Sequence, residues 1–347
     1  MSDNMSRPVR WGILGTGKIA RAFAEALQQT PGAVLAAVAS RDGARAAAFA
    51  AEFSAGFSAG FSTEPHPTAS YDSYQGLVDA DGIDLVYIGT PHPMHAENAL
   101  MALHAGKGVL CEKAFTVNRR EAEQVVATAR AKGLFLMEAM WTRFMPALAE
   151  VRRLIAAGTI GTPTQLSADF GFVAPTDPSH RVINHALGGG ALLDLGIYPL
   201  SIATALLGPV ASVVASAELG PTGVDLQTAF VLKHAGGAMS VCACSLTAVT
   251  PCELTVSGPL GQVRMNSRFH CATSVTVKLL GKDEYTVATP YLGNGYVHEI
   301  AEAQRCWQHG LLESPGMPLD ETLALMGVMD EIRGQIGLRY GADHADK

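Results

Sequence analysis

Hydrophobic and polar residues along the first 140 positions follow a pattern that predicts strands alternating with helices. Short, continuous apolar runs are typical of buried strands, and apolar residues spaced three and four apart are typical of helices. The expected strands are 9–14, 33–39, 83–88, 108–111 and 134–137, and the expected helices are 18–28, 43–53, one ending near 104, and 121–132. This alternation predicts a parallel sheet with helices on both faces.

The pattern changes after about Trp141. A helix is expected at 145–157, followed by strands at 163–172, 210–218, 228–233, 238–247, 252–257, 261–265 and 274–280. Strands separated by turns that contain Gly and Asn predict an open antiparallel sheet, and helices at 297–309 and 320–336 would pack against it. We therefore expect a doubly wound Rossmann domain of the α/β class at 1–140 and an α+β domain at 141–347.

Composition narrows the classes of function. The chain has 347 residues, 48% of them hydrophobic and 16% charged, which is typical of a globular protein with two cores. Its net charge of -7 argues against a nucleic acid or an anionic membrane as the main partner. The segment before Arg10 is short and polar, unlike a signal peptide, and no apolar run approaches the roughly 20 residues that span a bilayer. The expected location is the cytoplasm.

Two local features suggest no chemistry of their own. The six cysteines are too few for a disulfide framework in a chain of this length. Cys242 and Cys244 are expected to point into one buried face of a strand, and their C-x-C spacing lacks the second pair of a zinc site, so no metal is expected. The tandem repeat FSAGFSAGFS at 53–62 is interpreted as a surface insertion, with a binding loop as the alternative.

The segment WGILGTGKIA contains the spacing G-x-G-x-x-A at Gly15, Gly17 and Ala20. Gly15 permits a tight turn, Gly17 lets the backbone approach a pyrophosphate, and Ala20 lets the helix pack closely on the strand. The pyrophosphate would lie at the N-terminus of the following helix, where free N–H groups favour negative charge. Because the motif follows a strand and opens a helix, it predicts a dinucleotide site.

The end of the second strand, AVASRD, bears on which dinucleotide is bound. An NAD site usually has an acidic residue here for the ribose 2′-hydroxyl. This chain has Ser40 and Arg41, a hydroxyl and a cation that suit a 2′-phosphate. Asp42 follows and could still bind the ribose, and a polar turn with an exposed arginine is the alternative without function. The expected cofactor is NADP(H), with NAD(H) left open.

Two further segments carry candidate catalytic groups. In GKGVLCEKAF a buried strand delivers Glu112 and Lys113 at its carboxyl end, the edge where α/β sheets bind ligands. A cationic nicotinamide beside Lys113 would lower the pKa of the lysine. In GGGALLDLGIYPL, Asp194 and Tyr198 lie four residues apart and would share one helix face. A surface lysine, a capping aspartate and a packed tyrosine remain the structural alternatives.

With these motifs in place, the chain resembles the glucose–fructose oxidoreductase and inositol dehydrogenase family over nearly its whole length. The segments VLCEKAFTVN, LFLMEAMWTRFMP and GGGALLDLGIYPL are most similar to its subgroup of dimeric dihydrodiol dehydrogenases and NADP-dependent xylose dehydrogenases. The resemblance implies that Lys113 and Tyr198 are the catalytic pair and that Asp194 contacts substrate or orients the lysine. Glu112 would lie near the nicotinamide ribose.

The resemblance also implies the remaining site residues. The expected cofactor-binding residues are Gly12, Gly15, Thr16, Gly17, Lys18, Ile19, Ser40, Arg41, Asp42, Thr90, Pro91, His92, His95, Glu112 and Lys113. The expected substrate-binding residues are Trp141, Arg143, Phe170, Arg181, Asp194 and Tyr198. His95 also has the spacing of a residue that caps a helix, and Trp141 and Phe170 could equally belong to a core.

One residue departs from the family pattern: Ala114 stands where the family has proline. A cis bond before a residue other than proline costs about 2.5–4 kcal/mol. We therefore expect a trans bond between Lys113 and Ala114, with cis geometry the strained exception.

The expected activity is hydride transfer between NADP(H) and a hydroxyl carbon of a sugar, a cyclitol or a dihydrodiol. Two alternatives stay open: a glucose–fructose-type oxidoreductase that keeps its nucleotide, and a nucleotide-sensing regulator without activity. A half-apolar open sheet normally needs covering, and the resemblance adds the expectation of a homodimer through that sheet, with a tetramer also possible.

Overall fold

The computed structural model describes residues 7–54 and 67–344. Most of the FSAGFSAGFS repeat lies outside these ranges. The chain forms two compact units. Unit 1 consists of Met1–Thr116, Arg120–Trp141 and Leu292–Thr322, and unit 2 consists of Val117–Arg119, Thr142–Tyr291 and Leu323–Lys347. Each unit is thus assembled from separated stretches, and the division into functional domains at 1–140 and 141–347 stays a prediction.

Unit 1 contains a six-stranded sheet in the order β3-β2-β1-β4-β5-β6. Its strands are β1 (Val9–Leu14), β2 (Ala33–Ala39), β3 (Ala69–Tyr71), β4 (Leu85–Ile88), β5 (Gly108–Glu112) and β6 (Leu136–Ala139). All neighbours pair in parallel, and β2, β4, β5 and β6 are buried along their whole length. The doubly wound parallel sheet expected from the apolar runs is confirmed.

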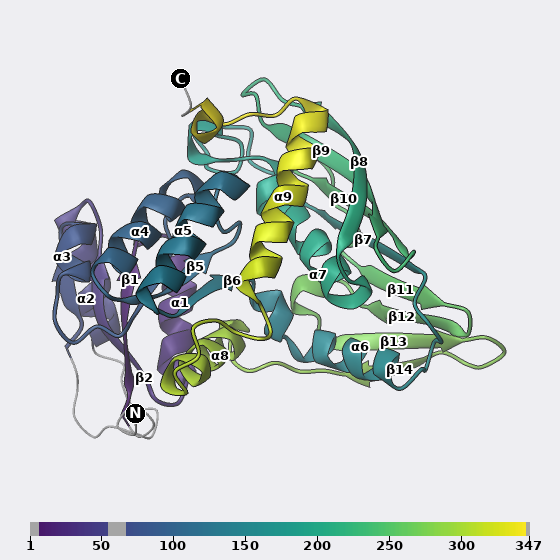
Figure 1. Ribbon diagram of the computed structural model, residues 1–347, viewed down its shortest axis with the longest axis horizontal. Helices are drawn as coiled ribbons and strands as arrows, with labels where there is room; N and C mark the ends of the chain where they lie inside the picture. Colours follow the sequence, from purple (N-terminus) through teal and green to yellow (C-terminus); the bar gives the residue numbers. More distant parts are fainter. Residues whose placement is uncertain (1–6, 55–66, 345–347) are drawn as a thin grey trace. The chain divides into compact units, whose positions relative to one another are not determined.

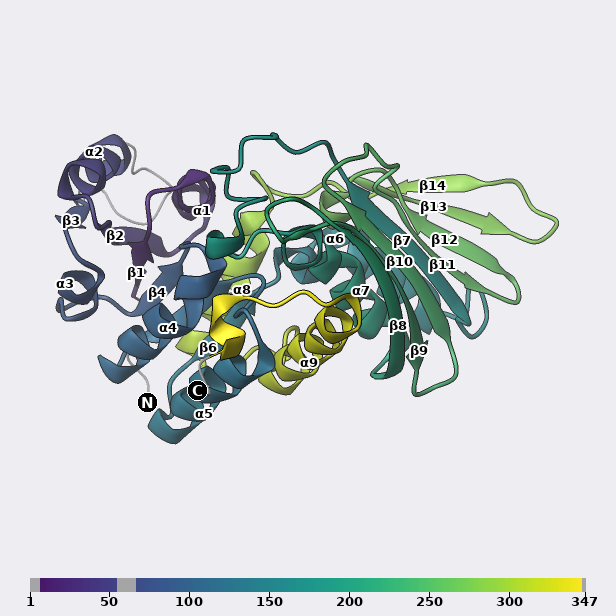
Figure 2. The same ribbon diagram turned by 90° about the horizontal axis from the view of Figure 1, so that it is seen from above.

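The helices of unit 1 cover both faces of this sheet. They are α1 (Lys18–Gln29), α2 (Gly43–Ser54), α3 (Tyr74–Val78), α4 (His95–His104) and α5 (Arg119–Lys132), with the short helical turns η1 (His92–Met94) and η2 (Trp141–Phe144). Figure 2 shows α1 and α2 on one side of the strands and α3, α4 and α5 on the other. The sequence pattern missed β3 and α3, because three and five residues are too few to show a period.

Helix α8 (Tyr296–Gln308) also belongs to unit 1 and packs against α1. The expectation that this helix packs on the antiparallel sheet is wrong, and its polar contacts give the reason. Trp11 Nε1 donates to Gln304 Oε1 at 3.1 Å, Gln304 Nε2 donates to the Pro31 carbonyl at 3.1 Å, and Asn294 Nδ2 donates to the Ala22 carbonyl at 2.8 Å. These bonds hold α8 and the segment just before it against β1, α1 and the turn before β2.

Unit 2 contains an eight-stranded sheet in the order β14-β13-β12-β11-β7-β10-β9-β8, seen in Figure 1 as a fan of arrows. Its strands are β7 (Gln165–Gly171), β8 (Val210–Leu219), β9 (Asp225–His234), β10 (Met239–Ser245), β11 (Leu254–Gly258), β12 (Gly261–Met265), β13 (Ser274–Leu279) and β14 (Tyr285–Ala288). All pairs are antiparallel except β7 with β10, which is parallel. The purely antiparallel expectation is therefore corrected to a mixed sheet, because the long connection from β7 to β10 allows a parallel return.

Helices line one face of this sheet. Helix α6 (Pro146–Ala156) packs on β12 and β13, and α7 (Ile197–Leu207) packs on β7 and β10. Helix α9 (Leu319–Ile336) is tied to β8 by Gln335, whose side chain accepts from Ala215 N and donates to the Val213 carbonyl, both at 2.8 Å. Cys242 and Cys244 point into the buried face, as expected.

One stretch, His185–Leu207, is long and apolar enough by composition to cross a membrane, which corrects the expectation that no such run exists. Its most apolar window is 78% buried inside the structure. Burial against the sheet accounts for its apolar composition, as in the core helix of a soluble protein.

Candidate functional site

The turn between β1 and α1 has the backbone features of an anion site. Gly15 has a φ of +108°, and a Cβ there would lie 3.0 Å from the Gly89 carbonyl oxygen, so only glycine fits without strain. Gly17 is the N-cap residue of α1 and has no side-chain cap, and a Cβ built there would meet nothing within 4 Å. The first N–H groups of α1 therefore adjoin open space, while Ala20 is fully buried behind them.

Gly12 has a different local role. It lies inside β1, where a Cβ would come within 2.7 Å of a methyl carbon of Leu77 in α3. The close packing of α3 on the sheet requires this glycine, and its place among the cofactor-binding residues stays a prediction.

Three residues that follow β2 make different contacts: Ser40, Arg41 and Asp42. Ser40 Oγ accepts from Asp42 N at 3.2 Å, and Asp42 Oδ1 accepts from Arg45 N at 3.2 Å, so the Asp42 carboxylate caps the start of α2. Arg41 is exposed. Burial raises the pKa of the Tyr74 hydroxyl, and the nearby charges of Arg41 and Arg45 oppose this rise.

Two cations and a tyrosine therefore gather at this strand end. The sequence analysis missed Arg45 and Tyr74. A signal for Arg45 is present, because it lies one helical turn after Arg41.

The loop after β4 is held by a buried histidine, His95. His95 is buried, with Nε2 at 2.8 Å from the Thr90 carbonyl oxygen and Nδ1 at 3.0 Å from the Ala114 carbonyl oxygen. A neutral ring carries one N–H and donates to one of these carbonyls. Burial lowers the pKa of His95 to about 3, which keeps the ring neutral. The capping alternative for this side chain is not what the structure contains, since the N-cap of α4 is Met94 and no side chain caps it.

Lys113 follows the carboxyl end of β5 and is half-buried. Its backbone N–H donates to Glu112 Oε2 at 3.1 Å, and Tyr87 donates to Glu112 Oε1 at 2.6 Å. The peptide bond between Lys113 and Ala114 is cis, so the expectation of a trans bond is wrong. His92 Nε2 lies 3.2 Å from the Lys113 carbonyl oxygen, and His95 contacts that of Ala114.

In unit 2, Asp194 lies in the π-helical turn η4 (Leu192–Gly196), and Tyr198 lies in the first turn of α7. Both side chains are buried. Arg181 Nη1 contacts Asp194 Oδ1 at 3.0 Å, which joins two of the expected substrate-binding residues in an ion pair. Sequence spacing placed Asp194 and Tyr198 on one regular helix, whereas the structure separates them by the end of a π-helical turn.

The glycines before this turn are packed without room for side chains. Gly190 has a φ of +131°, and a Cβ there would lie 2.9 Å from the Tyr340 hydroxyl oxygen and closer still to Asp225. Tyr340 donates to the Gly189 carbonyl at 2.5 Å. Asp225 Oδ2 accepts from Leu192 N at 2.7 Å and from Thr228 Oγ1 at 2.6 Å. No sequence motif indicates that the distant Tyr340 and Asp225 support the turn that carries Asp194.

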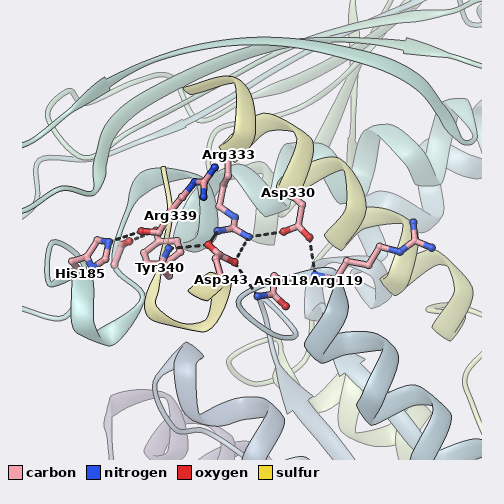
Figure 3. Close-up of polar contacts among 9 residues, drawn as sticks. Asn118, Arg119, His185, Asp330, Arg333, Arg339, Tyr340 and Asp343 are labelled. Atoms are coloured by element: carbon pink, nitrogen blue, oxygen red, sulfur yellow. Dashed lines mark hydrogen bonds and ion pairs between the residues drawn. The ribbon is translucent and has the colours of Figure 1, made fainter. Parts of the chain in front are cut away.

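The C-terminal segment that contains Tyr340 is fixed by a charged network, drawn in Figure 3. Arg333 is buried and donates to Asp343 at 2.5 Å and to Asp330 at 2.6 Å. Asp343 also accepts from Tyr340 N at 2.8 Å and from Asn118 Nδ2 at 2.9 Å. The network holds Tyr340 against the glycines.

Arg143 anchors α7 through its side chain. The buried guanidinium donates to Ser201 Oγ at 2.8 Å, to the Ser201 carbonyl at 2.7 Å and to Thr204 Oγ1 at 3.1 Å. These contacts position the helix that begins with Tyr198. The expected contact of Arg143 with substrate stays a prediction.

An aromatic group surrounds Tyr198. Phe170 lies with its ring centroid 5.4 Å from that of Tyr198 and stacks on His270 at 4.4 Å with an interplanar angle of 8°. The centroids of His270 and Tyr198 are 5.7 Å apart. The sequence analysis missed His270, which lies in the short turn η5 (Phe269–Cys271) without a recognisable motif. Trp141 instead stacks on Tyr296 within unit 1, at 4.6 Å.

The described residues hold neither a metal site nor a disulfide. Among the residues that the structure describes, no group of three His, Cys, Asp or Glu side chains could hold a metal ion. The six cysteines are free and buried.

Comparison with known proteins identifies both halves of the chain. Residues 9–140 match the oxidoreductase family with an NAD-binding Rossmann fold, and residues 148–264 match the GFO/IDH/MocA C-terminal domain. The chain is 36% identical to a trans-1,2-dihydrobenzene-1,2-diol dehydrogenase of Danio rerio, over 96% of this chain and 99% of the relative. It is 34% identical to a D-xylose 1-dehydrogenase (NADP(+)) of Hypocrea jecorina, over 98% of this chain and 95% of the relative.

A solved structure extends the similarity to the whole fold. The 3-ketoreductase KijD10 of Actinomadura kijaniata, in complex with NADP and TDP-benzene, aligns with a TM-score of 0.83 and 26% identity, covering 95% of this chain and 98% of that chain. The family resemblance drawn from the three sequence motifs is thereby confirmed. The chain belongs to the GFO/IDH/MocA family of oxidoreductases with an NAD-binding Rossmann fold.

Proposed function

We propose that this protein is an NADP(H)-dependent oxidoreductase that acts on a hydroxyl carbon of a sugar, a cyclitol or a dihydrodiol. The choice of NADP(H) rests on the different contacts of the residues that follow β2. Asp42 caps α2, whereas Arg41 is exposed and Arg45 lies one turn further. Two guanidinium groups suit a 2′-phosphate dianion. The named relatives include an NADP-dependent xylose dehydrogenase, which supports the same cofactor.

The residues around the β1–α1 turn fit the rest of the dinucleotide. The free N–H groups at the start of α1 would bind the pyrophosphate, and the space beside Gly17 admits its oxygens. When bound, NADP⁺ supplies the hydride acceptor. Thr16, Lys18, Ile19, Thr90, Pro91 and His92 are proposed to complete this binding site.

Lys113 and Tyr198 are the proposed acid–base pair. Tyr198, in its deprotonated tyrosinate form, takes the proton of the substrate hydroxyl and becomes a neutral phenol. Lys113 hydrogen-bonds the same hydroxyl and favours its loss of the proton. Asp194, paired with Arg181, orients the substrate hydroxyls. General acid–base assistance of this kind contributes about 10²–10⁴-fold to a rate.

The residues around Tyr198 are proposed to bind substrate through one apolar side and one polar side. Phe170 stacked on His270 offers a flat surface for the apolar face of a sugar or a diol ring. Asp194 and Arg181 offer hydrogen bonds to hydroxyl groups. The two features together suit a dihydrobenzene diol and xylose, the compounds in the names of the two relatives.

The test is a screen of NADP⁺ reduction across aldopyranoses, cyclitols and aromatic dihydrodiols, followed by absorbance of the nicotinamide product. Turnover in one class and none in the others would assign the substrate. A purified protein that already carries nicotinamide absorbance would favour the oxidoreductase that keeps its nucleotide. Absence of turnover with all three classes would favour the nucleotide-sensing regulator.

We further propose a homodimer through the uncovered face of the unit 2 sheet, with the cytoplasm as the location. Val214, Val231 and Val241 lie side by side across β8, β9 and β10 and are 70%, 36% and 47% exposed. Such a flat apolar row is unfavourable in water, and an identical face would cover it. Light scattering of the parent and of Val231→Lys tests this proposal: a dimer that becomes a monomer supports it, and a parent monomer contradicts it.

A further inference from the structure

A buried carboxyl group lies in unit 1 outside the contacts described so far. Glu299 of α8 is fully buried, with no exposed surface. Neither of its carboxylate oxygens has a hydrogen-bond partner within the described part of the chain. An ionised carboxylate without a partner in such a place would be very unfavourable, whereas a protonated carboxyl is tolerated.

The groups around Glu299 do not supply a compensating positive charge. Its pKa is raised well above the ordinary glutamate value, first by burial and then by the negative charge of Glu112 in β5. Tyr87 of β4, which donates to Glu112 at 2.6 Å, and Tyr296 of α8 are the other ionisable groups of this cluster. Burial and the charge of Glu112 raise the pKa of Tyr87 as well, so Tyr87 stays neutral, as does Glu299.

Helix α1, which packs against α8, adds no further charge to this cluster. Helix α1 contributes Phe23, which stacks on Tyr87 with ring centroids 3.7 Å apart. Its charged residues are Lys18 and Glu25, which are exposed, and Arg21, which forms an ion pair with Glu52 of α2. The interior behind β5 therefore combines one hydrogen-bonded carboxylate, Glu112, with a second carboxyl that lacks hydrogen bonds of its own.

We propose that Glu299 is a positioning residue that holds a proton in the neutral pH range, so that Glu112 carries the single negative charge of this cluster. The consequence for the active site rests on the proposed function. Glu112 directly precedes Lys113, and its single charge sets the electrostatic potential at this lysine. A second negative charge from Glu299 would offset the positive potential by which Lys113 favours loss of the substrate proton, and it would slow the reaction.

The protonation of Glu299 is tested without turnover. Infrared difference spectra of the complete protein, in parent and Glu299→Gln forms, should contain a protonated-carboxyl band at neutral pH that the variant lacks. The matched control is Glu302→Gln on the same helix. At Glu302 burial raises the pKa, but hydrogen bonds from Arg305, Ser314 and Cys306 outweigh it and lower the pKa. Glu302 is therefore ionised, and its variant should keep the band.

The consequence for catalysis is tested by the pH profile of kcat/KM. In the parent, ionisation of Glu299 at alkaline pH should lower kcat/KM from one plateau to a second, lower plateau. Glu299→Gln cannot ionise, so its profile should lack this decline, while Glu302→Gln should follow the parent.

The outcomes separate the two proposals. Absence of a protonated-carboxyl band that depends on Glu299 overturns the inference, and so does a pH profile that Glu299→Gln leaves unchanged. A band that is present in a protein without turnover on any substrate class leaves the protonation supported and contradicts the proposed function. If Glu299→Gln fails to fold, a pH titration of the parent's band with isotope-labelled glutamate decides the protonation state.

Discussion

Arg181 Nη1 lies 3.0 Å from Asp194 Oδ1, and the two partners differ greatly in exposure. The Asp194 side chain is 4% exposed, whereas that of Arg181 is 59% exposed. The ion pair thus connects a buried carboxylate in the turn before Tyr198 to a cation that solvent reaches. Because solvent screens the exposed guanidinium, the pair contributes modestly to stability, so its effect should be found in substrate binding.

Replacement of Arg181 by alanine should raise KM for the substrate about tenfold and change kcat by less than about threefold. The reason is that the proposed role of Arg181 is to orient Asp194 for substrate hydroxyls and not to transfer a proton. Steady-state kinetics with the substrate found by the screen measure both constants. Arg181→Lys, which keeps the charge, is the control, and an unchanged KM in Arg181→Ala would remove the arginine from the substrate site.

Lys113→Met and Tyr198→Phe should each lower kcat by about 10²–10⁴-fold, because each removes a group that assists proton transfer. Binding of NADPH, followed by fluorescence titration, should survive in both variants. Retained turnover in both would contradict the assignment of the acid–base pair, whatever the substrate.

Arg41→Ala should reduce kcat/KM for NADP⁺ at least about tenfold, which corresponds to about 1.4 kcal/mol, and leave kcat/KM for NAD⁺ nearly unaffected. The loss follows from removing a guanidinium that faces the 2′-phosphate. Arg45→Ala should have a smaller effect in the same direction. A parent enzyme that already prefers NAD⁺ would show that Arg41 does not select the cofactor.

Asp225 gives a prediction for the pH dependence of stability. Burial raises its pKa to about 6, against the opposing hydrogen bonds from Thr228 and Leu192. The folded protein binds this proton more tightly than the unfolded chain. The resulting stabilisation is therefore complete below about pH 4 and is lost as the pH rises to about 6, by about 3 kcal/mol.

Asp225→Asn keeps an oxygen for Leu192 N and Thr228 Oγ1 and removes the ionisation. Thermal unfolding between pH 4 and 7 should show a smaller loss of stability with rising pH in this variant than in the parent. Parallel curves for the two proteins would mean that Asp225 does not titrate in this range.

The sequence predicted the parts of this protein that depend on local pattern. Strands 9–14, 33–39 and 261–265 have the predicted bounds. The first two are largely apolar runs with a glycine at one end, Gly15 and Gly32, which are local signals. Gly15, Gly17, Lys113 and Tyr198 were singled out because their proposed chemistry depends on spacing along a motif, and their functional roles stay predictions.

Features that depend on contacts across the chain were not predictable in this way. His270 meets Phe170 across a hundred residues, and Tyr340 meets Gly189 from the far end of unit 2. The cis bond before Ala114 has no local signal in the sequence, since alanine lacks the tolerance of proline for this form. Helix α8 has the period of any amphipathic helix, and only its contacts with Trp11 and Pro31 decide which unit it joins.

The separated stretches of each unit have a consequence for how the protein is made. Helix α8 completes unit 1, yet about 150 residues, Thr142–Tyr291, leave the ribosome between Trp141 and Leu292. At about 5–20 residues per second this takes roughly 8–30 s. During that interval the nascent first sheet lacks helix α8, and the surface of α1 that α8 covers stays exposed.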